Sequence, residues 1–188
     1  KSFFYCIRLP RISFPYGFTT IESSAFSYCS KLSTITLPNT ITSIGLSAFY
    51  YCSSLVTLII PKNVTIIEFK TFSGCISIST LTIPEGVTII KNEAFRNCTS
   101  LTSLIIPNSV TNIYDNAFRT CTKLYSVRLS ENLSMVNTSL FNECSNLASI
   151  SIPSKVEIIS RCAFQGCSNL RQVSLPKKLN NNRSLLFL

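Results

Sequence analysis

Cysteine is the residue type in this sequence that offers the most chemistry. The chain has nine cysteines and no histidine. Cysteine thiolates can bind a metal, form a disulfide or act as a nucleophile. No C-x-x-C pair is present, so the pattern does not favour a zinc site, and without histidine no Cys-His or Ser-His-Asp arrangement can form. Eight of the cysteines recur at a constant step of 23 residues: Cys6, Cys29, Cys52, Cys75, Cys98, Cys121, Cys144 and Cys167.

The remaining polar residues give no sign of catalysis. The five glycines form no phosphate-binding loop, and the eight acidic residues occupy different places in the repeat, so no acid pair is evident. We therefore predict that the chain is not an enzyme and has no catalytic residues, no cofactor and no metal site.

Other residue types keep the step of 23, which makes internal repetition the main feature of the sequence. The unit is P-x-x-V-T-x-I-x-x-x-A-F-x-x-C-x-x-L-x-x-I-x-I, and it runs through the chain without a break in register. Its phenylalanines are Phe26, Phe49, Phe72, Phe95, Phe118, Phe141 and Phe164.

Each part of the unit has a predicted conformation. The alternation in L-x-x-I-x-I indicates a half-buried strand, which the following proline ends. The V-T-x-I piece favours a second short strand or an extended turn, and A-F-x-x-C suits a single helical or 3₁₀ turn. A single repeat is too small to bury its apolar side chains, so about eight stacked repeats are expected to form one solenoid domain over residues 1–188.

Stacking would bring equivalent cysteines of neighbouring repeats to about 5 Å between backbones, within the range of a disulfide. Eight equivalent thiols favour no particular pairing, so we interpret them as buried free thiols packed as small apolar groups. Cys162 lies outside this column, in a variable position, and is expected to be exposed. It is either an incidental surface thiol or the site of an intermolecular disulfide.

The repeat closely resembles the BspA-like, or treponemal-type, leucine-rich repeat over essentially the whole chain. The segment from Ile106 to Ile113, continuing to Ala117-Phe118 and Cys121, carries the resemblance well. The resemblance implies a leucine-rich-repeat solenoid that is mostly β, with parallel strands on the concave face and short helical or 3₁₀ turns on the convex side. It also implies a surface or secreted protein that adheres to host matrix or to cells, and it transfers no catalytic residue.

A candidate partner surface lies on the outward positions of the predicted concave strands. One outward column is almost entirely hydroxyl-bearing and includes Thr34, Thr57 and Thr80. A solvated sheet face would explain it, because threonine favours strands. Exposed isoleucines on a strand are unusual, and Tyr and Arg are enriched in binding hot spots. We therefore hypothesise that a protein partner contacts a surface that is centred on Ile59, Ile105, Tyr125 and Arg128 and also includes Thr34, Thr57 and Thr80.

The predicted function is protein–protein interaction or adhesion at the cell surface or after secretion, with host matrix or cell-surface proteins as partners. The alternative is an intracellular scaffold, which free thiols would suit equally well. The net charge of +9 would allow nucleic acid as a partner, but the basic residues are scattered and form no run, so it is not favoured. No apolar stretch is long enough to cross a membrane.

Two further expectations concern the ends of the chain and its modification. The sequence begins at Lys1 within a repeat and stops just after Leu186 and Phe187 fill another A-F slot, which indicates a fragment of a longer protein. Glycosylation sequons occur about as often as chance predicts, so they are no evidence of secretion. They lie at Asn63, Asn97, Asn132, Asn137 and Asn182.

Overall fold

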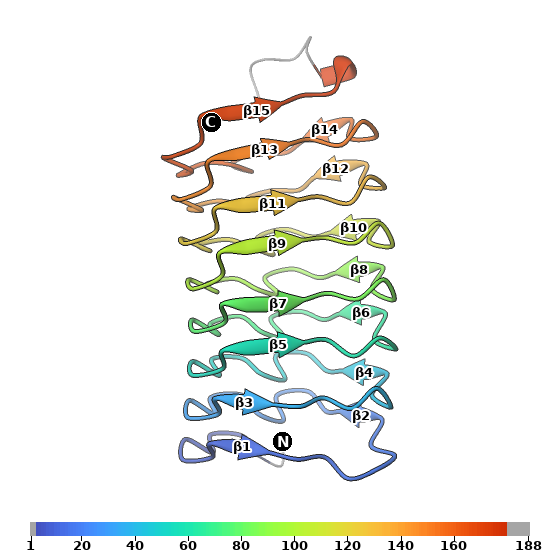
Figure 1. Cartoon of the computed structure of the whole chain (residues 1–188), viewed down its shortest axis with the longest axis vertical. Helices are drawn as coiled ribbons and strands as arrows, with labels where there is room; N and C mark the ends of the chain where they lie inside the picture. Colours follow the sequence, from blue (N-terminus) through green and yellow to red (C-terminus); the bar gives the residue numbers. More distant parts are fainter. Residues whose placement is uncertain (1–2, 180–188) are drawn as a thin grey trace.

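The chain forms a ladder of similar rungs stacked along one axis (Figure 1). The computed structural model describes residues 3–179. The sequon at Asn182 and the last A-F slot at Leu186 and Phe187 lie outside the described residues. The prediction of a leucine-rich-repeat solenoid built from parallel strands is confirmed.

One side of every rung carries a strand from the L-x-x-I-x-I piece. In β5, Thr57 and Ile59 are exposed while Leu58 is buried, as alternation predicts. Neighbouring strands are parallel and shifted by one repeat, so Leu58 lies opposite Leu81. We call the outward side of these strands the first face; it is the surface that the sequence analysis places on the concave side. Its strands are β1 (Arg11–Ile12), β3 (Thr34–Ile35), β5 (Thr57–Ile59), β7 (Thr80–Thr82), β9 (Ser103–Ile105), β11 (Ser126–Arg128), β13 (Ser149–Ser151) and β15 (Gln172–Ser174).

The V-T-x-I piece forms a second, shorter strand behind the first, so the strand alternative of the sequence analysis is confirmed. Most neighbouring strands of this set also pair in parallel, shifted by one repeat; for example, Ile67 lies opposite Ile90. Their outward side is called the second face. Its strands are β2 (Thr20–Ile21), β4 (Ser43–Ile44), β6 (Ile66–Ile67), β8 (Ile89–Ile90), β10 (Asn112–Ile113), β12 (Met135–Val136) and β14 (Ile158–Ile159).

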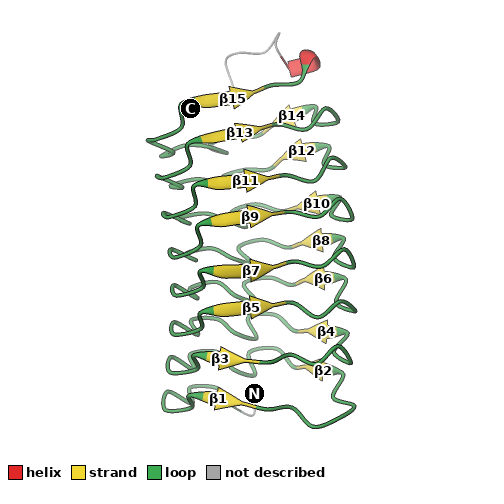
Figure 2. Cartoon of the chain, in the orientation of Figure 1, coloured by secondary structure: helices red, strands yellow, loops and turns green. Residues whose placement is uncertain are grey.

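The A-F-x-x-C piece forms separate turns, and the expected helical or 3₁₀ turn is wrong for this segment. Among the described residues the single helix is η1 (Lys177–Leu179), near the far end of the ladder (Figure 2). Turn bonds do form, since the Ala25 N–H donates to the Glu22 carbonyl at 3.1 Å. A helix cannot propagate because Ser24 and Tyr28 have left-handed backbones, with φ of 57° and 62°.

The left-handed residues recur in two columns and let the turns bond to the next rung. The Ser24 N–H donates to the Leu46 carbonyl at 2.9 Å, and the Tyr28 N–H donates to the Tyr50 carbonyl at 2.7 Å. The turns thus continue the hydrogen-bond ladder without being strands. We call this part of the ladder the turn edge. The first column comprises Ser24, Ser47, Lys70, Glu93, Asn116, Ser139 and Cys162, and the second Tyr5, Tyr28, Tyr51, Gly74, Asn97, Thr120, Glu143 and Gly166.

A continuous apolar core fills the space between the two strand layers and the turn edge. Its most regular component is a stack of phenylalanine rings, one from each rung, with centroids 5.2–5.9 Å apart and nearly parallel planes. The central rings, Phe49 and Phe95 among them, are fully buried. Each ring is therefore covered by its neighbours above and below, which makes the stability of one rung depend on the adjacent rungs.

Candidate functional site

The column of repeated cysteines is structural. Each buried thiol donates a hydrogen bond to the phenylalanine carbonyl 26 residues earlier, as Cys52 does to Phe26 at 3.1 Å. The same hydrogen bond forms in every rung from Cys29 to Cys167. All nine cysteines are free, so the interpretation of the column as free thiols is confirmed, and seven of its members are buried.

Burial suppresses ionisation of the Cys75 and Cys98 thiols. It raises the pKa of Cys75 to about 12, and it holds the pKa of Cys98 well above its ordinary value. Because the thiolate is the nucleophile and the metal ligand, these cysteines are chemically inert in the folded protein. Within residues 3–179, no three side chains of the metal-binding types come together.

Cys162 differs from the ladder, as the sequence analysis expects. It lies on the turn edge with a left-handed backbone and is partly exposed. The two alternatives for this thiol, an incidental surface group and the site of an intermolecular disulfide, both stay predictions.

Three of the four residues proposed as the centre of the partner surface lie in one outward column of the first face. Ile105 of β9 lies directly opposite Arg128 of β11, and Ile59 of β5 lies opposite Thr82, on the intervening rung. The two isoleucines are 62% and 63% exposed. Tyr125, 64% exposed, precedes β11 and lies about 10 Å along the strand from Arg128.

The three threonines of the hypothesis form a second, adjacent column. Thr57 and Thr80 are register partners on β5 and β7, and Thr34 stands at the start of β3. All three are exposed. The seven proposed residues therefore share one face and fall into two groups: the threonines with Ile59 toward the N-terminal end, and Ile105, Tyr125 and Arg128 toward the C-terminal end.

A hollow beside Tyr125 was not anticipated from the sequence. It lies where β11, β13 and β15 begin, and its lining residues are Tyr125, Asn146, Ala148, Asn169 and Arg171. Three of these, at positions 125, 148 and 171, occupy the same place in successive repeats. The larger side chains stand at the two ends and the alanine between them, which creates the depression. Aligning that column would have revealed the large–small–large order.

The charge of the first face has one sign. In the strands and their entry segments, from Arg8–Phe14 on the first rung to the equivalent 169–175 on the last, there is no Asp or Glu. The basic residues of these segments are Arg8, Arg11, Lys31, Lys123, Arg128 and Arg171. Within residues 3–179, none of these six forms a salt bridge, whereas on the turn edge Arg96 pairs with Glu93 at 2.8 Å.

Tyrosine rings that are exposed or partly exposed gather at the N-terminal half of the turn edge. Tyr5, Tyr28 and Tyr51 lie in one left-handed column, with centroids 4.9 and 5.6 Å apart, and Tyr50 contacts two of them. The stack ends at Gly74, where an added Cβ would lie 2.9 Å from the Tyr51 ring. Sequence reasoning missed this cluster, although the step of 23 between the tyrosines was visible.

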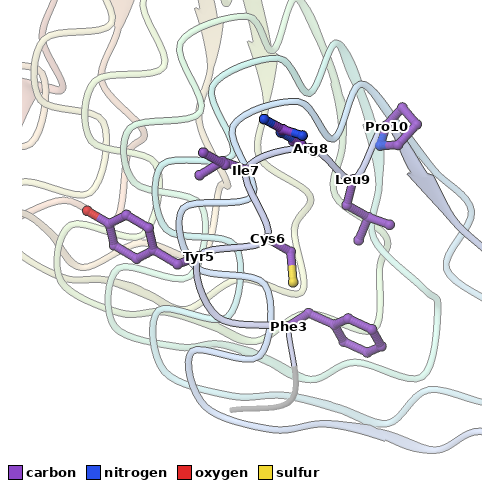
Figure 3. Close-up of a pocket in the computed structure, with 7 residues that line it drawn as sticks. All are labelled: Phe3, Tyr5, Cys6, Ile7, Arg8, Leu9 and Pro10. Carbon is purple, nitrogen blue, oxygen red and sulfur yellow. The ribbon is translucent and has the colours of Figure 1, made fainter.

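A second hollow lies at the first rung and is lined by residues 3 and 5–10 (Figure 3). Phe3, Cys6 and Leu9 occupy the repeat positions of Phe26, Cys29 and Leu32, which are buried core residues elsewhere. Tyr5 points away from these three side chains. We interpret this hollow as a part of the core stack that is incompletely covered by the described residues.

The sequon asparagines participate in the ladder. The amide nitrogen of Asn63 donates to the Asn39 carbonyl at 2.6 Å, and that of Asn132 donates to the Asn108 carbonyl at 2.8 Å. Asn137 bonds similarly to Ile113. Asn97, the other sequon asparagine among the described residues, is partly exposed.

The repeat, the parallel strands and the phenylalanine and cysteine columns define the chain as a leucine-rich-repeat solenoid. The profile of the BspA type leucine rich repeat region, which spans six copies, matches residues 1–102 and again 88–188. The chain belongs to this family. Comparison with curated proteins gives no match.

Solved structures of bacterial leucine-rich-repeat proteins resemble the chain. A Bacteroides ovatus leucine-rich repeat protein is 35% identical with a TM-score of 0.83, over 85% of this chain and 42% of its own. The T. pallidum leucine rich repeat protein is 32% identical with a TM-score of 0.78, over 81% of this chain and 72% of its own. A leucine rich cell surface protein of Faecalibacterium prausnitzii is 29% identical with a TM-score of 0.61, over 99% and 61%. The chain thus spans less than half the length of the B. ovatus protein.

The helices among residues 3–179 include none that is long and apolar enough to cross a membrane.

Proposed function

We propose that the chain is a non-enzymatic protein-recognition module that acts in adhesion at the cell surface, and that its first face contacts the partner. The single observation that carries the proposal is the set of large apolar and aromatic side chains on a sheet face whose other outward residues are mostly serine and threonine. Ile59, Ile105 and Tyr125 each leave more than 60% of their surface exposed to solvent.

Burying such side chains against a partner supplies a favourable free energy of about 25 cal/mol per Å² of apolar area. The neighbouring threonines and serines add hydrogen-bonding groups that tolerate a wet interface. The F. prausnitzii relative is described as a cell surface protein, which supports the same location for this chain.

The test measures attachment of protein-coated fluorescent beads to cultured host epithelial cells and to surfaces coated with matrix proteins. A first-face variant carries Ile59→Ser, Ile105→Ser, Tyr125→Ala and Arg128→Ala. The matched control carries Ile158→Ser on the second face, where the side chain is 52% exposed. We expect the first-face variant to lose attachment and the control to keep it.

Attachment that is equal for both variants would place the partner surface elsewhere. Location is tested separately by protease treatment of intact cells that express the full-length protein, with cleavage expected at the cell surface. Complete protection, reversed only by lysis, would favour the intracellular scaffold instead.

A further inference from the structure

We propose that the hollow at the start of β11, β13 and β15 binds a carboxylate side chain of an acidic polypeptide segment. We call it the Tyr125–Arg171 slot, defined by Tyr125, Asn146, Ala148, Asn169 and Arg171. This inference rests on the proposed function, because it specifies the chemistry of the partner at one end of the first face.

The backbone fixes the width of the slot. The Ala148 N–H donates to the Tyr125 carbonyl at 3.4 Å, and the Arg171 N–H donates to the Ala148 carbonyl at 3.0 Å. The three residues therefore rise from consecutive rungs, and Tyr125 and Arg171 are about 10 Å apart at the backbone. Ala148 forms a low floor between a phenol ring and a guanidinium.

The side wall consists of two asparagine amides. The Asn169 amide nitrogen donates to the Asn146 side-chain oxygen at 3.3 Å, which occupies the Asn146 acceptor and leaves its amide nitrogen to donate to a ligand. The backbone N–H groups of Ala148 and Arg171 are already bonded within the ladder. The donors that remain for a ligand are thus an amide N–H, a phenol and a guanidinium, and the Asn169 side-chain oxygen is an acceptor at the wall.

Charge complementarity decides which ligand fits. The guanidinium of Arg171 forms no salt bridge within residues 3–179, and the first-face segments contain no acidic residue to compete for it. An arginine fork binds a carboxylate through two parallel hydrogen bonds, and the tyrosine ring can cover the methylene groups that carry it.

The neighbourhood of the slot favours a polypeptide over a sulfated or carboxylated glycan. Ile105 is exposed on β9, beside Arg128 on the same face. Aliphatic side chains of a partner would bury this isoleucine, whereas a polysaccharide would leave it wet. The partner segment is therefore expected to combine acidic residues with aliphatic ones.

The experiment is selection of a displayed library of random 12-residue peptides against the purified chain, followed by binding measurements on the enriched peptides. Enrichment of Glu or Asp together with Leu, Ile or Val is expected. Arg171→Glu should weaken these peptides about tenfold or more, since loss of a charge-assisted bond and reversal of its charge both oppose binding. Its matched control is Arg161→Glu, which changes the net charge equally at an exposed arginine of the turn edge.

A second pair of variants tests the shape of the slot without changing charge. Ala148→Leu fills the floor and should weaken the same peptides, while Ser79→Leu makes a similar addition three rungs away, at the equivalent exposed position, and should not. Circular dichroism of each variant verifies that the fold is retained.

Three outcomes would overturn the slot. Peptides lost equally with Arg161→Glu would show only attraction to net charge, and heparin binding that depends on Arg171 without any acidic peptide would indicate a glycan site. Peptides that depend on Ile59 and Ile105 but not on Ala148 or Arg171 would reject the slot while leaving the proposed function intact.

Discussion

Each buried thiol on the cysteine ladder is short enough to fit beneath the neighbouring turn and polar enough to bond to a phenylalanine carbonyl. Cys75 donates to Phe49 at 3.2 Å, and its side chain is inaccessible to solvent. A free cysteine therefore performs two structural tasks in each of the seven rungs from Cys29 to Cys167, and its chemistry is blocked by the same burial.

This burial predicts a sharp division in thiol reactivity. Iodoacetamide applied to the folded protein at neutral pH should label Cys162 and Cys6, the two partly exposed cysteines, within minutes. The seven buried cysteines should react only after denaturation, because reagent and thiolate are both excluded from the core. Peptide mass spectrometry before and after addition of guanidinium measures the division. Labelling of Cys98 in the native state would contradict it.

The raised pKa values also predict a loss of stability at alkaline pH. An unfolded thiol ionises near its ordinary pKa of 9, whereas Cys75 keeps its proton in the folded state up to about 12. The unfolded state therefore binds fewer protons in this window, and stability falls as pH rises from 9 to 12. The loss is about 1.4 kcal/mol per pH unit for each such thiol.

Urea unfolding at pH 8, 9, 10 and 11 tests this dependence. In Cys75→Ala, the free energy of unfolding should fall less steeply with pH, by about 1.4 kcal/mol per pH unit, because one titrating thiol is removed. Val87→Ala, a buried variant without a titrating group, should lower stability equally at every pH. A pH dependence that is identical in Cys75→Ala and the unmodified protein would show that this thiol does not contribute.

At the scale of the elements, the left-handed columns distinguish the turn edge from a helix. Ser139 adopts φ of 53°, and its N–H donates to the Arg161 carbonyl of the next rung at 3.1 Å. The inter-rung bond holds the backbone in a region that costs a non-glycine residue about 1–2 kcal/mol. Local strain is thus the consequence of continuing the ladder through a turn.

Because of this strain, replacing serine by glycine should change the stability of the protein in opposite directions at a turn position and at a strand position. Ser139→Gly should stabilise the protein by about 0.5–1 kcal/mol, because glycine enters the left-handed region freely. Ser126→Gly, on the exposed side of β11, should destabilise it by about 0.5–1 kcal/mol, because glycine loses more entropy in a strand. Chemical denaturation of both variants gives the two signs. A loss of stability at both positions would mean that the turn is not strained.

The strands could be predicted from the sequence, and the turns could not. Alternation around Leu58 and the following proline identify β5 by physics that acts within a few residues. The left-handed positions carry Ser47, Lys70 and Glu93, residue types that give no local sign of that conformation, because inter-rung hydrogen bonds impose it. A single-turn helix was the natural expectation from spacing alone, and it was wrong.

Part of the candidate site could likewise be predicted from the sequence, and part could not. Exposed residues such as Ile105 follow from alternation, since a strand places every second side chain outward. The Tyr125–Arg171 slot depends on a small residue, Ala148, lying between two large ones on adjacent rungs. That relation is visible only when positions one repeat apart are compared as neighbours in space.

For the whole molecule, stability is distributed along one axis. Phe95 stacks between Phe72 and Phe118, with centroids 5.5 and 5.3 Å away, so its ring contributes to the core of three rungs. At the first rung, by contrast, Ile12, Phe14 and Phe18 are only partly buried.

The stack predicts both the cost of a central deletion and a gradient of protection. Phe95→Ala should destabilise the protein by about 3–5 kcal/mol, the range for deleting a buried aromatic ring.

Amide hydrogen exchange should be slowest in β5 to β11 and fastest in residues 3–20, since end rungs open without breaking the centre. Uniform exchange along the described chain would indicate a single all-or-none unit. Equal costs for Phe95→Ala and Phe14→Ala would count against the gradient.

The backbone bonds that join the rungs have a consequence for how such a protein can diversify. Each rung presents the same carbonyl and amide groups to its neighbours, whatever side chains it carries outward. A gene that gains or loses one whole repeat through unequal recombination would therefore still encode a continuous ladder, lengthened or shortened by a single layer. Such recombination could rearrange the order of exposed residues on the first face, while the buried columns allow each resulting protein to fold.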